Sequence, residues 1–457
     1  MDTKKLRQKI LDLAIHGKLV PQDPNDEPAS VLLERIRSEK ERLIKEGKIK
    51  RSRKTTKTSD AACDEQEVPF DVPENWVMVK VSDIFNLNPK SNLDEERQIG
   101  FIPMALVEDG FTGRHSYIKR IWRDVKKGYC HFQDGDIGIA KISPCFENRK
   151  SVVFKNLPNG YGAGTTELVI LRPLVIYAKF YLYLFKSDWY LHEGTKYFKG
   201  VVGQQRVHKE IFTDLHIPLP PLKEQQRIAA EIERWFKLID IIEQGKTDLQ
   251  STIKQAKNKI LDLAIHGKLV PQDPNDEPAS ELLKRINPKA EITCDNGHYP
   301  KLPKGWAMTS MQEVCRLIDG EKLNNRTLTN LDARFLRGLS DGKVLKEGRY
   351  VPVNTCMILV DGENSGEVFI TPMEGYQGST FKQLSFNVNM NKEYILYIIT
   401  QNRKALRENK VGSAIPHLNK KLFKAIQVPI PPYAEQERIV CAINTAFNKL
   451  NTIEESL

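Results

Sequence analysis

The side chains that could perform catalysis or bind a cofactor occur in this sequence without the partners that such chemistry needs. Residues 431–433 (PPY) could belong to an N-P-P-Y motif, which holds the exocyclic amino group of adenine, but Ile430 stands where the asparagine would accept that hydrogen bond. Residues 160–164 (GYGAG) lack the strand-to-helix context and the ribose-binding acid of a dinucleotide loop. Residues 134–136 (DGD) lack the spaced E-x-K of a metal-dependent nuclease, and no G-x-x-x-x-G-K-[ST] occurs. We therefore expect a chain without catalytic residues.

The cysteines and the apolar runs restrict the class of protein further. Seven cysteines are scattered through the chain, an odd number with no C-x-x-C spacing, which argues against a disulfide framework and against a zinc site. The opening MDTKKLRQKILDLAIHGK has neither the unbroken apolar core nor the cleavage site of a signal peptide. No later run approaches the roughly 18 apolar residues of a membrane span. We expect reduced cysteines, no metal, no membrane and a cytoplasmic location.

The charge balance fits a polyanionic partner. Lys plus Arg number 69 against 59 for Asp plus Glu, a formal net charge of +10. This excess is modest, and many housekeeping proteins are as basic. It is densest between residues 37 and 58, where ten basic residues stand against three acidic ones. Two interpretations of this stretch remain open: a solvated helix that runs into a linker, or a segment that contacts phosphates.

Two internal repeats organise the chain. KILDLAIHGKLVPQDPNDEPAS occurs at residues 9–30 and again, letter for letter, at 259–280, and PLPPLKEQQRI at 218–228 is answered by PIPPYAEQERI at 429–439. When the C-terminal sequence from EQERI onward is joined to the N-terminal sequence, the composite matches the central stretch 224–268 with a difference of four residues. The chain is therefore cyclically pseudo-twofold. Each half should hold one variable globular unit and one helical unit.

Both helical units show the spacing of paired helices. Apolar residues of the central stretch alternate at steps of three and four, interrupted only at Lys246, and the C-terminal stretch repeats this pattern. A helix from about residue 224 to residue 263 would be on the order of 60 Å long, which is a spacer between domains. A homodimeric coiled coil is the alternative, but the two internal copies supply an intramolecular partner. The residues expected to pair the helices are Ile228, Ile232, Trp235, Ile239, Ile242, Leu249, Ile253, Ile439, Ile443, Leu450 and Ile453.

The globular units share their edges and differ inside. Residues 218–221 (PLPP) and 429–432 (PIPP) can neither continue a strand nor lie inside a helix, so they mark domain exits. Trp76 and Trp306 stand at equivalent entrances, each just ahead of an alternating apolar strand, and are expected to be core anchors and not base-stacking platforms. Short β-rich runs such as DIGIAKI at 136–142, mixed with apolar helices, predict small α+β domains.

Two domains that recognise different DNA sequences would need a shared scaffold with different interiors. The scaffold can fix each unit on a duplex through phosphate contacts, while varied loops supply Arg, Lys, Asn and Gln side chains that read base edges. The candidate DNA contacts of the first unit are Lys141, Arg149, Lys150, Gln204, Gln205, Arg206 and Lys209. Those of the second unit are Asn324, Asn325, Arg326, Arg334, Arg337, His417, Lys420 and Lys421.

This arrangement resembles the specificity subunit of type I restriction-modification systems over essentially the whole chain. That family has two target recognition domains in tandem, each followed by a conserved helical region, with the exit motif seen here as PPLKEQQRI and PPYAEQERI and with ILDLAIHGKLVPQD after the helices. The resemblance implies an α+β fold in which two long antiparallel, coiled-coil helical regions separate two globular target recognition domains. The predicted domains are 1–58 (part of the distal helical region plus a basic linker), 68–221 (first recognition domain), 222–290 (central helical region), 298–432 (second recognition domain) and 433–457 (C-terminal helix pairing with the central helix).

The resemblance also implies a role. It identifies a non-catalytic subunit of a prokaryotic adenine methyltransferase and ATP-dependent endonuclease, with each domain binding one half of a bipartite, asymmetric double-stranded DNA target. Two methyltransferase subunits, and for cleavage two nuclease subunits, would dock on the helical regions. No cofactor is implied in this chain, whereas AdoMet, ATP and Mg would belong to the partner subunits. The order departs from the commonest one in the family, because part of the distal helical region stands at residues 1 to about 50. The alternative is a two-headed scaffold or ligand-binding protein without DNA specificity.

Overall fold

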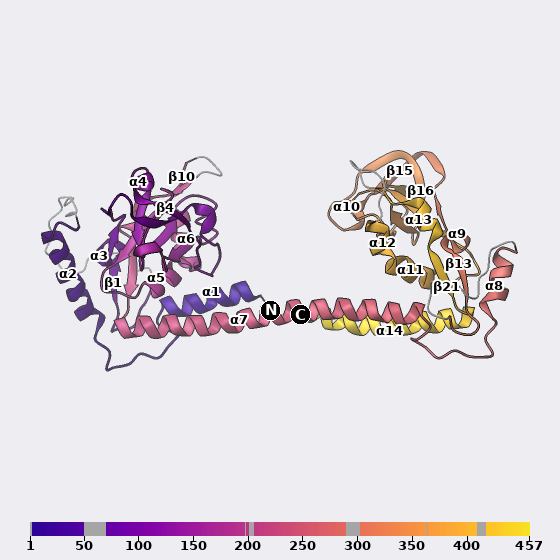
Figure 1. The fold of residues 1–457 in the computed structure, drawn as a ribbon, viewed down its shortest axis with the longest axis horizontal. Coiled ribbons are helices and arrows are strands. Elements are labelled where there is room, and N and C mark those ends of the chain that lie inside the picture. The colour runs from indigo at the N-terminus through magenta and orange to yellow at the C-terminus, as the bar shows by residue number, and fades with distance from the viewer. Residues whose placement is uncertain are drawn as a thin grey trace. The chain divides into compact units, whose positions relative to one another are not determined.

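The computed structural model describes residues 2–49, 70–196, 198–200, 205–288, 302–362, 364–408 and 417–457. The chain forms two compact units, Met1–Gln244 and Gly245–Leu457. Helix α7 (Leu222–Ile265) supplies its N-terminal half to the first unit and its C-terminal half to the second. Each unit combines a globular α+β domain with a helix pair (Figure 1). Within the described residues, no helix is long and apolar enough to cross a membrane.

The first unit begins with two helices and continues into a domain of two four-stranded sheets, ordered β2-β9-β6-β7 and β4-β3-β8-β5. Its helices are α1 (Thr3–Ile15), α2 (Ala29–Lys45), α3 (Val81–Ile84), α4 (Trp122–Val125), α5 (Ala178–Phe185) and α6 (Asp188–Thr195). Its strands are β1 (Val77–Lys80), β2 (Phe85–Leu87), β3 (Gln98–Ile102), β4 (Ile118–Ile121), β5 (Cys130–Gln133), β6 (Ile137–Ala140), β7 (Ser151–Val153), β8 (Tyr161–Gly164), β9 (Leu168–Pro173), β10 (Phe198–Lys199), β11 (Arg206–Val207) and β12 (His216–Leu219).

The second unit holds one four-stranded sheet, ordered β14-β20-β17-β18, and a small barrel of β15, β16 and β19. Its helices are α8 (Ala279–Ile286), α9 (Met311–Val314), α10 (Ala333–Leu336), α11 (Lys392–Gln401), α12 (Arg403–Glu408), α13 (Lys420–Ala425) and α14 (Tyr433–Glu455). Its strands are β13 (Ala307–Ser310), β14 (Cys315–Ile318), β15 (Lys322–Leu331), β16 (Val344–Val351), β17 (Cys356–Leu359), β18 (Val368–Ile370), β19 (Gly375–Gln377), β20 (Phe381–Phe386) and β21 (Gln427–Ile430).

In both units, the strand that enters the globular domain pairs with the strand that leaves it. β1 lies antiparallel to β12, with Val77 opposite Leu219, and β13 lies antiparallel to β21, with Ala307 opposite Ile430. Two prolines follow each exit strand, and α7 and α14 begin directly after them. Proline lacks the N–H that a ladder needs and favours the first turn of a helix, so the strand ends and the helix starts there. The expectation that the whole proline run stands outside the strands is wrong at Pro218 and Pro429, which lie within β12 and β21 because an edge strand of a two-stranded sheet tolerates a proline.

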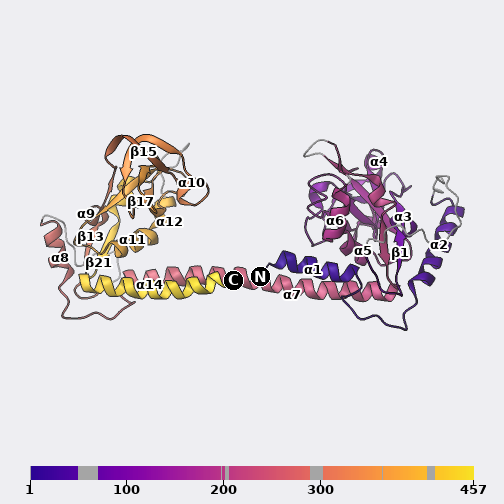
Figure 2. The ribbon, with the colours of Figure 1, turned by 180° about the vertical axis from the view of Figure 1, so that it is seen from behind.

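The two helices of each pair run antiparallel (Figure 2). Matched ion pairs join them. In the first unit, Arg7 of α1 is buried against α7, where it contacts Asp240 at 2.6 Å and Glu243 at 2.8 Å. In the second unit, Lys257 of α7 contacts Glu454 of α14 at 2.8 Å. Lys257 and Glu454 are the equivalents of Arg7 and Glu243 in the cyclic alignment, so the pseudo-twofold relation extends to individual contacts.

The predicted helix-pairing residues divide into a buried and an exposed group. Trp235, Ile242, Leu249 and Ile453 are exposed and Leu450 is partly exposed, so the expected seam does not extend to them. In the first unit the globular domain also packs on α7, where Phe236 contacts Tyr183 edge to face at 5.7 Å. The buried face of α7 therefore serves the domain as well as α1 and departs from a heptad seam. The residues that are buried as expected are Ile228, Ile232, Ile239, Ile253, Ile439 and Ile443.

Candidate nucleic-acid interface

A buried carboxylate joins the first globular domain to its helices. Glu224, in the first turn of α7, is 0% exposed. Its two oxygens accept hydrogen bonds from Trp76 Nε1 at 3.0 Å and from Gln22 Nε2 at 2.9 Å. Gln22 also donates to the carbonyl of Gly17, the residue that follows α1 with φ +66°. One carboxylate thus ties the repeated segment, the domain entrance and the domain exit together.

The second unit repeats this arrangement. Glu435 of α14 accepts hydrogen bonds from Trp306 Nε1 at 3.0 Å and from Gln272 Nε2 at 3.1 Å. Burial raises the pKa of Glu435 above its usual value, although the two donors and the nearby Arg438 act against this shift. We call each set the carboxylate junction, which comprises Gln22, Trp76 and Glu224 in the first unit and Gln272, Trp306 and Glu435 in the second.

An ion pair and a glutamine flank each junction. Arg227 contacts Asp26 at 2.6 Å, and its equivalent Arg438 contacts Asp276 at 2.7 Å. Gln225 donates to the Pro220 carbonyl at 2.8 Å and accepts from the Tyr177 N–H at 2.8 Å. Gln436 makes the equivalent bonds to Pro431 and Asn391, both at 3.0 Å. Every member is internally satisfied, so these groups position the domain and are not available to a ligand.

The structure confirms the predicted role of the two tryptophans, but the sequence did not reveal the glutamates that they contact. Trp76 and Trp306 are each 4% exposed, as expected of core anchors. The sequence analysis did not predict a role for Glu224 or Glu435, because a glutamate in a helix ordinarily lies on the surface. The signal was present in the sequence, since an identical Glu-Gln pair follows both proline exits while the domain interiors differ.

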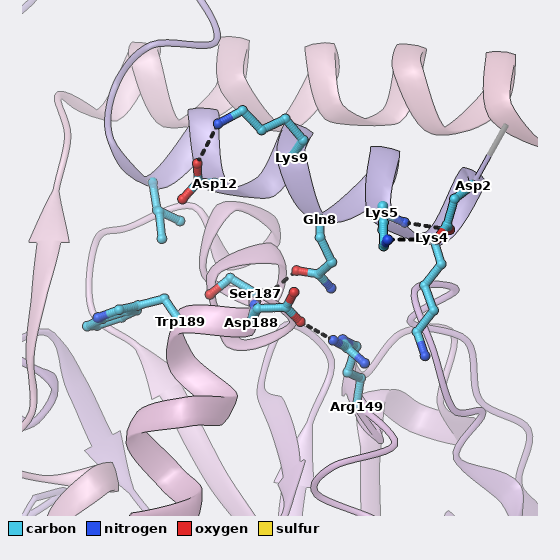
Figure 3. Close-up of a pocket in the computed structure, with 11 residues that line it drawn as sticks. Asp2, Lys4, Lys5, Gln8, Lys9, Asp12, Arg149, Ser187, Asp188 and Trp189 are labelled. Carbon is cyan, nitrogen blue, oxygen red and sulfur yellow. Dashed lines mark hydrogen bonds and ion pairs between the residues drawn. The ribbon is translucent and has the colours of Figure 1, made fainter.

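Two candidate DNA contacts of the first unit are engaged inside it. Figure 3 shows Arg149 pointing to Asp188 at the start of α6, with which it forms an ion pair. The Arg149 side chain is only 10% exposed and also lies over the Phe111 ring at 5.2 Å. Lys150 Nζ donates to the backbone carbonyl of Val107 at 2.8 Å. Contact of Arg149 or Lys150 with DNA stays a prediction, and DNA would have to compete there with acceptors that the protein already supplies.

The remaining candidates of the first unit lie on its surface. Lys209 is exposed, and Lys141 and Gln205 are partly exposed. Among the described residues, neither Lys141 nor Lys209 has an ion-pair partner. Arg206 is half exposed but paired through two nitrogens with the Glu167 carboxylate, at 3.0 and 2.8 Å. Gln204 lies outside the described residues, as does the part of the basic stretch from residue 50 to residue 58.

The second unit divides its candidates in the same way. Arg326 pairs with Glu374, Arg337 pairs with Glu367 and His417 pairs with Asp361, so a DNA phosphate would compete with a carboxylate at each. The remaining side chains are exposed, and no carboxylate of the described residues pairs with the cations among them. They are Asn324, Asn325, Arg334, Lys420 and Lys421.

Several exposed cations are not among the DNA contacts predicted from the sequence. Lys119 and Arg120 lie on the edge strand β4, and Lys343 and Lys346 lie on or next to β16. No alternation of charged and apolar residues marks them, since Lys119 and Arg120 are neighbours in the sequence and Lys346 follows two apolar residues. A search of the described residues finds no cluster of His, Cys, Asp and Glu able to hold a metal ion.

Comparison with known proteins agrees with this architecture. The family model described as "Type I restriction modification DNA specificity domain" matches residues 73–251 and 303–457. The type I restriction enzyme EcoAI specificity subunit of Escherichia coli is 34% identical over 99% of this chain and 90% of its own length. The EcoEI specificity subunit of Escherichia coli is 40% identical over 69% of this chain and 62% of its own length.

Solved structures show the same fold. The HsdS subunit from Thermoanaerobacter tengcongensis aligns over 85% of this chain and 93% of its own with a TM-score of 0.54 at 16% identity. A chain from a study of complex assembly and conformational transition of the type I R-M system aligns over 85% of this chain and 94% of its own, with a TM-score of 0.60 at 16% identity.

The fold and the duplicated junction define a protein with two recognition domains, each carried on a helix pair. The match over both domains is specific to one family. The chain belongs to the specificity subunits of type I restriction-modification systems, and its function is DNA sequence recognition within such a system.

Proposed function

We propose that each globular domain reads one half of a bipartite, asymmetric DNA target. The observation that carries this proposal is the carboxylate junction, which recurs with the same partners around two domains whose sheets differ. Because the same junction holds both domains, two different domain surfaces can face DNA in equivalent orientations. Exposed basic and amide side chains of each domain then supply phosphate contacts and base readout.

The partner chemistry follows from the family. The chain directs two methyltransferase subunits and, for cleavage, two nuclease subunits, which bring the catalytic residues. AdoMet, ATP and Mg serve those subunits, and this chain contributes no cofactor and acts in the prokaryotic cytoplasm. In support of two equivalent partners, the repeated segment offers the same ion pair twice, the exposed Lys9 beside the partly exposed Asp12 and the exposed Lys259 beside the partly exposed Asp262.

Methylome sequencing of a host with and without the gene tests the proposal. We expect one adenine-methylated motif made of two unlike half-sites with an unspecified gap, present only with the gene. A contiguous or palindromic motif would contradict two unlike readers. The absence of any gene-dependent methylation would instead favour a scaffold without DNA specificity.

Phosphate contacts are tested by the dependence of DNA binding on salt. Lys209→Ala and Lys420→Ala remove exposed cations, one from each domain. Each change should weaken binding to target and non-target duplexes alike and reduce the slope of log affinity against log salt by about 0.9. Lys449→Ala on α14 removes an equally exposed charge outside both domains and is the matched control. If all three variants keep the wild-type slope, Lys209 and Lys420 do not contact phosphates.

A further inference from the structure

A pocket of about 210 Å³ opens on the first globular domain, where the end of β2, the start of β5, the end of β6 and the start of β9 meet. Lys90 and Lys141 line it, and neither Asp nor Glu does. Its deeper wall is apolar, since Leu168 and Val169 are buried. The larger groove drawn in Figure 3 differs in kind, because Lys5 pairs with Asp2 there and Lys9 pairs with Asp12.

The two lysines of this pocket have no counter-charge. Within the part of the chain that the structure describes, neither Lys90 nor Lys141 forms an ion pair or a side-chain hydrogen bond. The carboxylate that Lys141 influences is Glu167, but both oxygens of Glu167 are held by Arg206. Unpaired cations at a concave site attract an anion, because the low-dielectric walls focus their field.

Two polar neutral residues of the pocket wall, Asn88 and His131, already have hydrogen-bond partners. The Asn88 side-chain oxygen accepts from the Ile170 N–H at 3.0 Å. The His131 ring lies 3.3 Å from the Ser91 nitrogen and 3.2 Å from the Lys126 carbonyl, and burial lowers the pKa of His131, which keeps the ring neutral. These groups therefore offer the lysines no acceptor, and the positive charge of the pocket comes from Lys90 and Lys141 alone.

We propose that this pocket holds one phosphodiester of the bound DNA, with Lys90 and Lys141 on the phosphate and the attached sugar against the apolar wall. The proposal rests on the DNA reading proposed above and adds the place where the first domain grips the backbone. DNA is favoured over a free nucleotide because the cationic surface continues beyond the pocket. The Lys141 carbonyl accepts from Val207 N at 2.8 Å, which joins the pocket to the segment that carries Gln205 and Lys209.

A chemical double-mutant cycle tests this site in the full chain assembled with its methyltransferase subunits. Target duplexes that carry a single neutral methylphosphonate at successive positions are bound by wild type and by a Lys90→Ala/Lys141→Ala variant. In wild type, one position should cost about 3- to 10-fold in affinity, and the variant should lose that penalty while its salt slope falls by about 0.9. Lys155→Ala removes an exposed lysine of the same domain outside the pocket and should keep the full penalty. Circular dichroism checks that the variants fold, and Lys90→Gln/Lys141→Gln provides a milder pair.

Each outcome is decisive. An unchanged pattern of methylphosphonate penalties in the folded variant would overturn the site. Competition by ATP or inorganic phosphate without any position-specific penalty would also overturn it, because the pocket would then serve a free anion. A wild-type complex that binds DNA without sequence preference would refute the proposed function and leave the pocket result readable, since methylphosphonates report charge contacts on any sequence.

Discussion

Replacing Glu224 with glutamine should weaken the first unit and leave the second unit intact. The buried carboxylate accepts from Trp76 Nε1 at 3.0 Å and from Gln22 Nε2 at 2.9 Å. Glutamine keeps one acceptor oxygen, but its amide group then faces the other donor, so one hydrogen bond is lost and one buried donor is left unpaired. Because a hydrogen bond to a charged group contributes about 1.5–3 kcal/mol and an orphaned group costs about 1–3, we expect the free energy of unfolding to fall by about 2–4 kcal/mol.

Hydrogen exchange followed by mass spectrometry separates the two units within the intact chain. Amides of β1 and β12 should lose protection by roughly 30- to 1000-fold, since each 1.4 kcal/mol is a factor of ten, whereas β13 and β21 should not change. Glu435→Gln is the matched control and should produce the opposite pattern. Equal losses in both units, or a loss below twofold in β1 and β12, would refute the assignment of Glu224 as the residue that fastens the first domain.

Two further changes test the packing of the first unit. Gly17→Ala places a Cβ 2.4 Å from Pro73 Cγ at φ +66°, whereas Gly47→Ala has φ +69° and no atom within 4 Å. Calorimetry should show that Gly47→Ala costs only the backbone strain of about 1 kcal/mol and that Gly17→Ala costs about 1–3 kcal/mol more; equal costs would exclude the clash. Burial lowers the pKa of Lys186 from 10.5 to about 7, so the unfolded chain binds more protons above pH 7. The first unit of wild type should therefore gain stability from pH 7 towards 10.5, and Lys186→Met should lack that gain. A stability difference between the two proteins that does not change with pH would show that Lys186 titrates normally.

The parts of the fold that depend on local chain chemistry followed from the sequence. The proline exits predicted where α7 and α14 begin, because two consecutive prolines, 220–221 and 431–432, remove the N–H groups that would continue the ladder. They did not predict that Pro218 and Pro429 lie inside the exit strands, because an edge strand tolerates a single proline. Periodicity predicted Ile228, Ile232 and Ile239 on a buried face. It failed at Trp235, because the face of α7 is shared with a globular domain whose position no helical period encodes.

The surroundings of the candidate DNA-binding residues were harder to predict from the sequence. Arg149 and Lys150 look like DNA-binding residues in sequence, since both are cations in a polar loop. Their acceptors, Asp188 and the Val107 carbonyl, are 39 and 43 residues away in the chain. Only the fold therefore shows that Arg149 and Lys150 already have hydrogen-bond acceptors within the protein. Lys90 was overlooked for the converse reason, because its pocket is assembled from four separate strands.

Contacts within the chain account for part of the identity of the repeated segment. The entrance or exit of the following domain is contacted by each of three residues, Gly17, Gln22 and Asp26. Their second copies make the same contacts, so attachment of the two domains requires these residues twice. The exposed Lys9 pairs with the partly exposed Asp12, and no ion pair within the described residues joins either of them to the domain. Holding the domain in place does not require these two residues, yet both copies of the segment keep them. We propose that they serve two identical partner subunits, since each partner would have to find the same surface on a chain whose recognition domains differ.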